Sequence, residues 1–138
     1  MYKKKVFKWH CLIIIMERRD KNMTKINENT LMVISSDKMG EGEEEIGKIL
    51  MKNFMYALTE AEDIPSTIIF YNGGAKLVSK DSLVIEELKK LEELGVEILT
   101  CGTCLNYYNL TEELAVGKIT NMYTIVEKMS ASKKIIKP

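Results

Sequence analysis

The stretch VEILTCGTC, residues 96–104, joins an apolar run to a pair of cysteines. Its first five residues predict a short buried strand, and Gly102 and Thr103 are typical of the turn that follows one. A helix can begin after this turn, and a helix start offers free N–H groups and a partial positive charge that favour a thiolate. We therefore predict that Cys101 is an accessible, reactive thiol with Cys104 as its resolving partner. The alternative is that both cysteines only fill space in the core.

Outward from this stretch, apolar runs alternate with segments of helical periodicity. The apolar runs are continuous, which indicates strands of a parallel sheet that is covered by helices on both faces. The helical segments repeat apolar residues every three or four positions, as in Ile46, Ile49 and Leu50. Strands are expected at residues 31–35, 67–71, 96–100, 116–119 and 134–136, and helices at 43–58, 82–94, 105–114 and 121–130. The predicted fold class is α/β, a three-layer α/β/α sandwich with a mostly parallel five-stranded sheet.

Polar, glycine-rich loops follow the predicted strands. In folds of this class the ligand crevice lies beyond the carboxyl ends of the strands. The adjacent Gly73 and Gly74 would let backbone N–H groups approach a ligand or a neighbouring thiolate, and a plain tight turn is the alternative. Tyr107, Tyr108 and Tyr123 are expected to pack as half-buried aromatics, and the alternative is that they form a wall of the pocket. Besides the catalytic candidates Cys101 and Cys104, the predicted pocket residues are Ser36, Asp37, Asn72, Gly73, Gly74, Gly102, Thr103 and Asn121.

The composition predicts one small domain and excludes several classes of protein. The chain has 138 residues, enough for a single core. Residues 1–29 carry eight basic and three acidic side chains and are expected to be an extension outside the fold, and residues 30–138 to form the domain. That domain is mildly acidic and lacks a basic face, which excludes nucleic acid as a partner. No apolar run near the start approaches the roughly 20 residues of a membrane span.

The cysteines also bear on location and cofactors. Their odd number, three, and the lack of a recognisable secretory leader predict a reducing, cytoplasmic location. No metal is expected, because one Cys-x-x-Cys pair supplies two ligands and the single histidine, His10, lies in the extension. No cofactor is expected either, because Gly40 and Gly42 are not followed by the Gly-Lys-Ser/Thr of a phosphate loop.

Four stretches combine into a recognisable pattern: ISSDKMGEG at residues 34–42, FYNGG at 70–74, CGTCL at 101–105 and TNMY at 120–123. Together they resemble the DsrE-like superfamily, and in particular the DsrE-like C-terminal domain of YedF-type selenium metabolism proteins. The resemblance implies a five-stranded parallel sheet between helices and a homo-oligomer. In the sulfur-relay members it also implies a cysteine after the third strand that carries sulfur as a persulfide, and Cys101 matches that position.

Two features depart from that family pattern. YedF-type proteins carry an N-terminal domain like the TusA sulfur carriers, with a Cys-Pro motif. This sequence has no Cys-Pro, and residues 1–29 are too short for such a domain. Many relatives also have Arg-Gly shortly after the cysteines, where this chain has Tyr108-Asn109.

Three functions remain open from the sequence. The resemblance implies a sulfur or selenium relay, in which Cys101 accepts a persulfide or its selenium equivalent from a donor protein and passes it to an acceptor, with a TusA-like carrier as one such partner. Such a protein would be a sulfurtransferase-like carrier. The second function is a thiol-disulfide oxidoreductase that uses the CGTC pair. The third is a non-catalytic binding or assembly module, whose cysteines merely pack.

Overall fold

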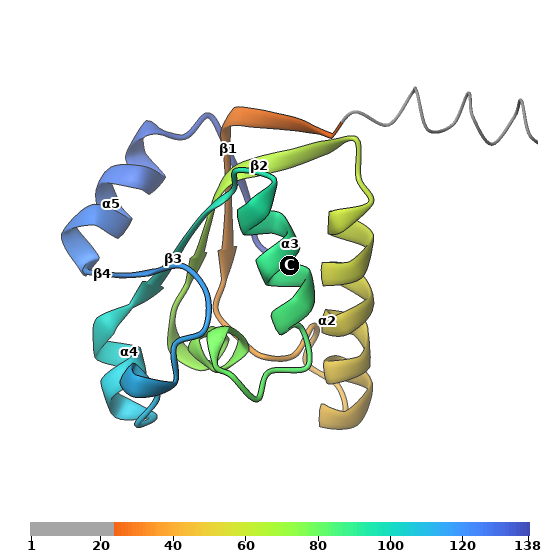
Figure 1. The fold of residues 1–138 in the computed structure, drawn as a ribbon, viewed down its shortest axis with the longest axis vertical. Helices are drawn as coiled ribbons and strands as arrows, with labels where there is room; N and C mark the ends of the chain where they lie inside the picture. Colours follow the sequence, from red (N-terminus) through yellow and green to blue (C-terminus); the bar gives the residue numbers. More distant parts are fainter. Residues whose placement is uncertain (1–23) are drawn as a thin grey trace, which may run out of the picture.

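A parallel β-sheet runs through the middle of the molecule (Figure 1). The computed structural model describes residues 24–138. Within this range five strands, each parallel to its neighbours, lie in the order β4-β3-β2-β1-β5. They are β1 (Lys25–Ile34), β2 (Asp63–Phe70), β3 (Glu97–Cys101), β4 (Lys118–Thr120) and β5 (Lys134–Ile136). The α/β class and the parallel five-stranded sheet predicted from the sequence are confirmed.

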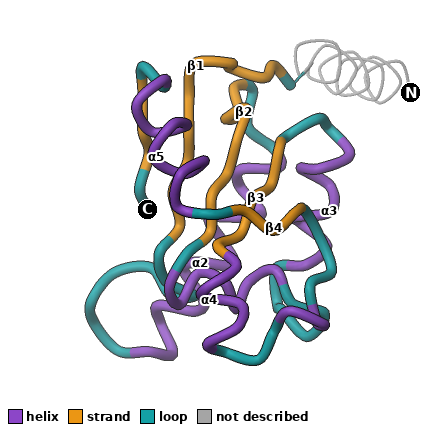
Figure 2. The backbone as a smooth tube through the Cα atoms, turned by 90° about the vertical axis from the view of Figure 1, so that its left-hand side faces the viewer, coloured by secondary structure: helices purple, strands orange, loops and turns teal. Residues whose placement is uncertain are grey.

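Helices cover both faces of this sheet. Helix α5 (Met122–Ala131) lies on one side of the strands, and α2 (Glu44–Thr59) and α3 (Ile85–Glu93) lie on the other (Figure 1). Figure 2 shows α5 and α3 on opposite sides of the strands from a second direction. Short helical segments follow the strand ends or link the longer elements: η1 (Asn72–Val78), α4 (Gly102–Tyr107) and η2 (Thr111–Glu113).

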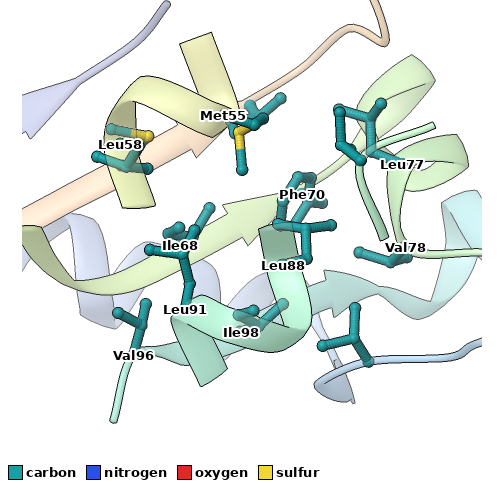
Figure 3. Close-up of a cluster of buried hydrophobic side chains, with 14 of the residues drawn as sticks. Met55, Leu58, Ile68, Phe70, Leu77, Val78, Leu88, Leu91, Val96 and Ile98 are labelled. Atoms are coloured by element: carbon teal, nitrogen blue, oxygen red, sulfur yellow. The ribbon is translucent and has the colours of Figure 1, made fainter. Parts of the chain in front are cut away.

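The strands divide their apolar side chains between the two faces of the sheet. On the side of α2 and α3, Ile68 and Phe70 of β2 are fully buried and belong to one cluster with Met55 and Leu88 (Figure 3). The side of α5 holds a smaller cluster: Leu31, Val33, Ile69, Leu99, Cys101 and Ile125. Because successive side chains of a strand point to opposite faces, a sheet covered on both sides requires continuous apolar runs.

Helix α2 meets the sheet partly with side chains other than those predicted. Met51 and Met55 are buried, while Ile46 and Ile49, expected on the apolar face, are 48% and 49% exposed. Both sets follow helical periodicity, so the hydrophobic pattern does not choose between them. Gly47 favours the observed orientation, because this side of the helix passes so close to the loop before it that a side chain would press on that loop.

Strand β1 begins at Lys25, earlier than the residue 31 expected from the sequence. Its first half is largely exposed and polar, so no apolar run marks it. Backbone pairing with β2 forms this part instead, and beside it the Lys25 N–H donates to the Glu62 carbonyl oxygen at 2.6 Å. Residues 25–29, assigned to the extension, therefore lie in the sheet. The rest of the expected extension, residues 1–23 with its histidine, lies outside the described residues.

Thr100 of β3 is fully buried, and its hydroxyl has no hydrogen-bond partner among residues 24–138. We expect Thr100→Val to leave the free energy of unfolding unchanged or to raise it by about 1 kcal/mol, because a methyl group needs no partner. Thr59→Val is the matched control, since the buried Thr59 hydroxyl donates to the Tyr56 carbonyl oxygen at 2.7 Å. Urea denaturation should show that Thr59→Val lowers the free energy of unfolding by about 1 kcal/mol. An equal loss in both variants would contradict the prediction.

Candidate functional site

The carboxyl ends of β2 and β3 border an open cavity of about 400 Å³. Its wall comes from the residues after β2, from α4 and from the start of α5: Tyr71, Asn72, Thr103, Cys104, Tyr107, Tyr108 and Met122. The Asn72 backbone N–H donates to the Cys104 Sγ at 3.0 Å, a contact between positions 32 residues apart. A thiol and a backbone donor thus meet in one cavity at the strand ends.

Cys101, expected to be the accessible thiol, is buried. Its side chain is 4% exposed and packs in the cluster with Leu99 and Ile125. The cause is the extent of β3: Cys101 still pairs with Thr120 of β4, so its side chain lies on the same face as that of Leu99. Cys104 lies within the first turn of α4 and lines the cavity instead. The expectation of an exposed Cys101 at the rim of the sheet is therefore wrong.

The surroundings of Cys104 oppose its ionisation. Burial raises the pKa of the Cys104 thiol, the hydrogen bond from the Asn72 N–H lowers it, and the neighbouring Cys101 raises it again. The net effect places the pKa of Cys104 above its usual value of 9.0. The sequence predicts an easily ionised thiol at this site. The thiol that lines the cavity, Cys104, is instead harder to ionise than an ordinary cysteine.

Alkylation of Cys104 in the native protein is expected to accelerate with pH up to and beyond the usual pKa of 9.0. The thiolate is the reacting form, and below the pKa its share grows about tenfold per pH unit. Because the pKa of Cys104 is raised, its labelling rate should still be climbing where an ordinary thiol levels off. Iodoacetamide labelling, assigned to individual cysteines by peptide mass spectrometry, measures this. A rate that is already constant near neutral pH would contradict the raised pKa.

Aromatic and cationic side chains surround the contact between Asn72 and Cys104. The Tyr108 hydroxyl donates to the Asn72 Oδ1 at 3.4 Å. The Tyr107 ring meets the Tyr108 ring edge-on with centres 5.1 Å apart, and the Lys76 Nζ lies 4.8 Å from the centre of the Tyr108 ring. The Asn72 backbone is left-handed, with φ +49°, a conformation that asparagine adopts more readily than most residues.

The sequence match to a known family takes in this whole cavity. The DsrE/DsrF-like family matches residues 33–138, from the second half of β1 to the end of the chain. The chain belongs to the DsrE/DsrF-like family. No protein of curated function matches it.

Solved structures share the fold of this DsrE/DsrF-like chain. The ychN protein of E. coli aligns with a TM-score of 0.59 and 12% identity, covering 81% of this chain and 100% of its own. MTH1491, a protein of unknown function from Methanobacterium thermoautotrophicum, aligns with a TM-score of 0.60 and 17% identity, with coverage of 81% and 100%. BT1422, a protein of unknown function from Bacteroides thetaiotaomicron, aligns with a TM-score of 0.56 and 19% identity, covering 80% of this chain and 95% of its own. These likenesses concern the fold.

In this DsrE/DsrF-like chain, two of the predicted pocket residues, Asn72 and Thr103, line the cavity beside Cys104. Gly102 directly precedes Thr103 as the first residue of α4. Two of the loops expected at one crevice, the one after β2 and the one after β3, thus meet at this cavity. The cavity wall does not include the other predicted residues: Ser36, Asp37, Gly73, Gly74, Gly102 and Asn121.

Three of these residues make contacts elsewhere. Asp37 lines a separate cavity of about 180 Å³. The Ser36 Oγ accepts a hydrogen bond from the Lys38 N–H at 3.2 Å, within its own loop. The Asn121 Oδ1 accepts from the Thr124 N–H at 3.0 Å and caps the start of α5. Local backbone structure accounts for the polar side chains of Ser36 and Asn121.

The adjacent glycines after β2 differ in what they require. The Gly74 backbone lies against that of Ile34, so that an added Cβ would stand 2.9 Å from the Ile34 carbonyl carbon and closer still to the carbonyl oxygen. An added Cβ at Gly73 would meet nothing nearer than 3.6 Å. The N–H that reaches sulfur comes from Asn72, the residue before this pair. Gly74 therefore serves the close packing of β1 against the loop after β2.

Tyr107 and Tyr108, at the end of α4, belong to the cavity wall, a role that the sequence allows but does not favour. Tyr107, expected to be half-buried, is 79% exposed, and it lines the cavity with Tyr108 and Met122. Tyr123, also expected to be half-buried, is 87% exposed and lies outside this cavity wall. One signal was available: Tyr107 and Tyr108 follow Cys104 by three and four residues, which places all three on one side of a helix.

Residues 24–138 of this DsrE/DsrF-like chain contain neither a metal-binding cluster nor a membrane-spanning helix. No three His, Cys, Asp or Glu side chains there gather closely enough to hold a metal ion. No helix in that part of the chain is both long and apolar enough to cross a membrane.

Proposed function

We propose that this DsrE/DsrF-like protein is a sulfur or selenium carrier and that Cys104 holds the cargo as a persulfide or its selenium equivalent. One observation carries the assignment: Cys104 is the thiol in the wall of the cavity, while Cys101 is buried on the side of α5. Membership of the DsrE/DsrF-like family supports the carrier function, because the resemblance to its sulfur-relay members implies a sulfur-carrying cysteine after the third strand. The resemblance matched Cys101 to the sulfur-carrying position, and the proposal assigns that role to Cys104 instead.

The proposed reaction exchanges one sulfur atom between thiols. The Cys104 thiolate attacks the outer sulfur of a donor persulfide, so that a new S–S bond forms while the donor S–S bond breaks. The donor leaves as a thiolate and takes up the proton that Cys104 lost. In the onward step an acceptor thiolate attacks the same outer sulfur, and Cys104 leaves. Sulfur is neither gained nor lost in the sum, and no external oxidant or reductant takes part.

Two properties of Cys104 suit it to hold such a cargo. The Asn72 N–H, 3.0 Å from Sγ, stabilises negative charge on this sulfur when the cargo leaves. The raised pKa of Cys104 makes it a slower leaving group, because release accelerates as the pKa of the leaving thiol falls. The raised pKa therefore slows the loss of the cargo to stray thiols.

The partners in this proposal are donor and acceptor proteins of the cytoplasm, a TusA-like carrier among them. A reducing compartment keeps both thiols available. Homo-oligomerisation is part of the proposal, and the outer side of α2 supports it. Ile46, Ile49 and Leu50 are each more than two fifths exposed there, and neighbouring exposed apolar side chains are a common feature of protein–protein interfaces.

Thiol-disulfide exchange is the second candidate function, because Cys101 lies close enough to Cys104 to raise its pKa and both are free thiols. In that reaction the Cys104 thiolate attacks a substrate disulfide, and Cys101 then attacks the mixed disulfide. The products are a Cys101–Cys104 disulfide and two substrate thiols. This route needs the buried Cys101 to react, whereas sulfur transfer needs Cys104 alone.

Incubation of the reduced protein with glutathione persulfide tests the proposed function. We expect the intact mass to rise by one sulfur atom per chain, and fragmentation of the peptide that contains the CGTC motif to place this atom on Cys104. Sulfur on Cys101 would contradict the assignment. The loss of two hydrogens, which marks a disulfide between the two cysteines, would favour the exchange reaction. An unchanged mass would favour a binding or assembly module.

A further inference from the structure

The hydrogen bond from Asn72 to Cys104 depends on how the Asn72 residue is held. Asn72 lies directly after β2, at the first position of η1, with φ +49°. From this left-handed conformation its N–H donates to the Cys104 Sγ at 3.0 Å. Asparagine adopts this conformation because its short polar side chain forms local hydrogen bonds that compensate for the crowding. A group that holds the Asn72 side chain therefore also holds the donor to sulfur.

Tyr108 is the residue that holds it. The Tyr108 hydroxyl donates to the Asn72 Oδ1 at 3.4 Å, across 36 residues of sequence. The Tyr108 N–H donates to the Cys104 carbonyl oxygen at 3.1 Å, so both side chains project from the same short helix. The Tyr107 ring and the Lys76 ammonium group bracket the Tyr108 ring and limit its rotation.

We propose that Tyr108 is a positioning residue for the sulfur chemistry of Cys104 and acts through Asn72, an inference that rests on the proposed function. Three hydrogen bonds close a ring, from Tyr108 to Asn72, from Asn72 to the Cys104 sulfur, and from the Tyr108 backbone back to Cys104. Tyr108 makes no hydrogen bond to the sulfur itself. Its hydroxyl keeps the Asn72 N–H in place before negative charge develops on Sγ, and a donor fixed in advance needs no reorganisation when that happens.

The ionisable groups around the sulfur come from four elements. They are Cys101 at the end of β3, Tyr71 after β2, the two tyrosines of α4, and Lys76 of η1 beside them. The residue that α5 contributes, Met122, is not ionisable. Tyr108→Phe leaves all of these groups in place except the Tyr108 hydroxyl, which donates to the Asn72 Oδ1.

Tyr108→Phe tests the proposal by removing a single hydroxyl. We expect the midpoint of the pH profile of Cys104 alkylation to rise, and the rate at neutral pH to fall about two- to fivefold, because the thiolate loses part of a hydrogen bond. Tyr123→Phe is the matched control, since it removes the hydroxyl of an 87% exposed tyrosine outside the cavity wall, and it should follow the wild type. Thermal unfolding of each variant establishes that it is folded.

Asn72→Gly separates positioning from other effects of the phenol. Glycine keeps the N–H and readily adopts a positive φ, but it lacks the Oδ1 that Tyr108 holds. If Tyr108 acts through Asn72, the double variant Asn72→Gly, Tyr108→Phe should alkylate at the rate of Asn72→Gly alone. Additive effects in the double variant, or a Tyr108→Phe profile equal to that of the wild type, would overturn the proposal.

Alkylation needs no sulfur cargo, so the alkylation profiles test the positioning role of Tyr108 independently of the carrier function. A wild-type protein that takes up no sulfur from glutathione persulfide contradicts the carrier function, whatever the alkylation profiles show. A protein that loads sulfur normally, but in which Tyr108→Phe changes neither alkylation nor the rate of loading, contradicts the positioning role alone.

Discussion

Cys104→Ala is expected to abolish sulfur loading from glutathione persulfide, and Cys101→Ala is expected to retain it. Cys104 is the thiol in the cavity wall and the one that receives the Asn72 N–H, so its removal leaves no thiol in that wall for a donor to meet. Cys101 is 4% exposed and lies in an apolar cluster, out of reach of a donor that enters this cavity. Intact mass after a fixed incubation measures both variants, and loading of Cys104→Ala should fall to background.

Cys101→Ala should in addition load faster than the wild type. Cys101 is one of the causes that raise the pKa of Cys104, so without it more of the Cys104 thiol is ionised at a given pH. Alanine is the better replacement at this buried position, because a serine hydroxyl would need a partner that an apolar cluster does not supply. If folded Cys101→Ala takes up no sulfur while Cys104→Ala does, the cargo belongs to Cys101 and the assignment from the cavity is wrong.

Gly74→Ala is expected to destabilise the fold by about 3 kcal/mol or more, because the added methyl group overlaps with backbone atoms that cannot rotate away. The nearest of these atoms are the carbonyl oxygen and carbon of Ile34 at the end of β1, the carbon at 2.9 Å. The same Ile34 oxygen accepts the Tyr71 N–H at 3.2 Å, so separation of the two segments would also displace Asn72 from the sulfur. Urea denaturation measures the free energy of unfolding of this variant.

Gly73→Ala is the matched control for this prediction. A Cβ at Gly73 would meet the nearest atom, the Ser36 Cα, at 3.6 Å, which is ordinary van der Waals contact. We expect this variant to change the free energy of unfolding by less than about 1 kcal/mol. Similar stabilities for Gly73→Ala and Gly74→Ala would mean that β1 and the loop after β2 do not approach each other as closely as described.

The layered fold could be predicted from the sequence because the buried parts of β1, β2 and β3 carry apolar side chains on both faces. The exceptions have physical causes. The first half of β1, residues 25–29, is exposed and polar, and backbone pairing forms it without a hydrophobic signal. Helix α2 has two apolar stripes, and the one with Met51 and Met55 packs on the sheet. Gly47 favours this orientation, because it lets the helix lie close to the loop that precedes it.

The candidate site could be predicted only in outline. The position of the thiol motif after β3 follows from the hydrophobic pattern, but the choice between Cys101 and Cys104 depends on one residue of strand length. Because β3 includes Cys101, that side chain continues the alternation toward α5, and α4 turns Cys104 toward the cavity. The partnership of Tyr108 with Asn72 joins segments 36 residues apart, which a single sequence does not reveal.

The raised pKa of Cys104 ties the site to the stability of the whole domain. When the chain unfolds, this thiol returns to its usual pKa of 9.0, so below that pH both states keep the proton and the equilibrium is unaffected. Above it the unfolded chain gives up its proton first, which draws the equilibrium toward unfolding until the pH passes the native value. Alkaline conditions that create the thiolate therefore also weaken the scaffold that presents it.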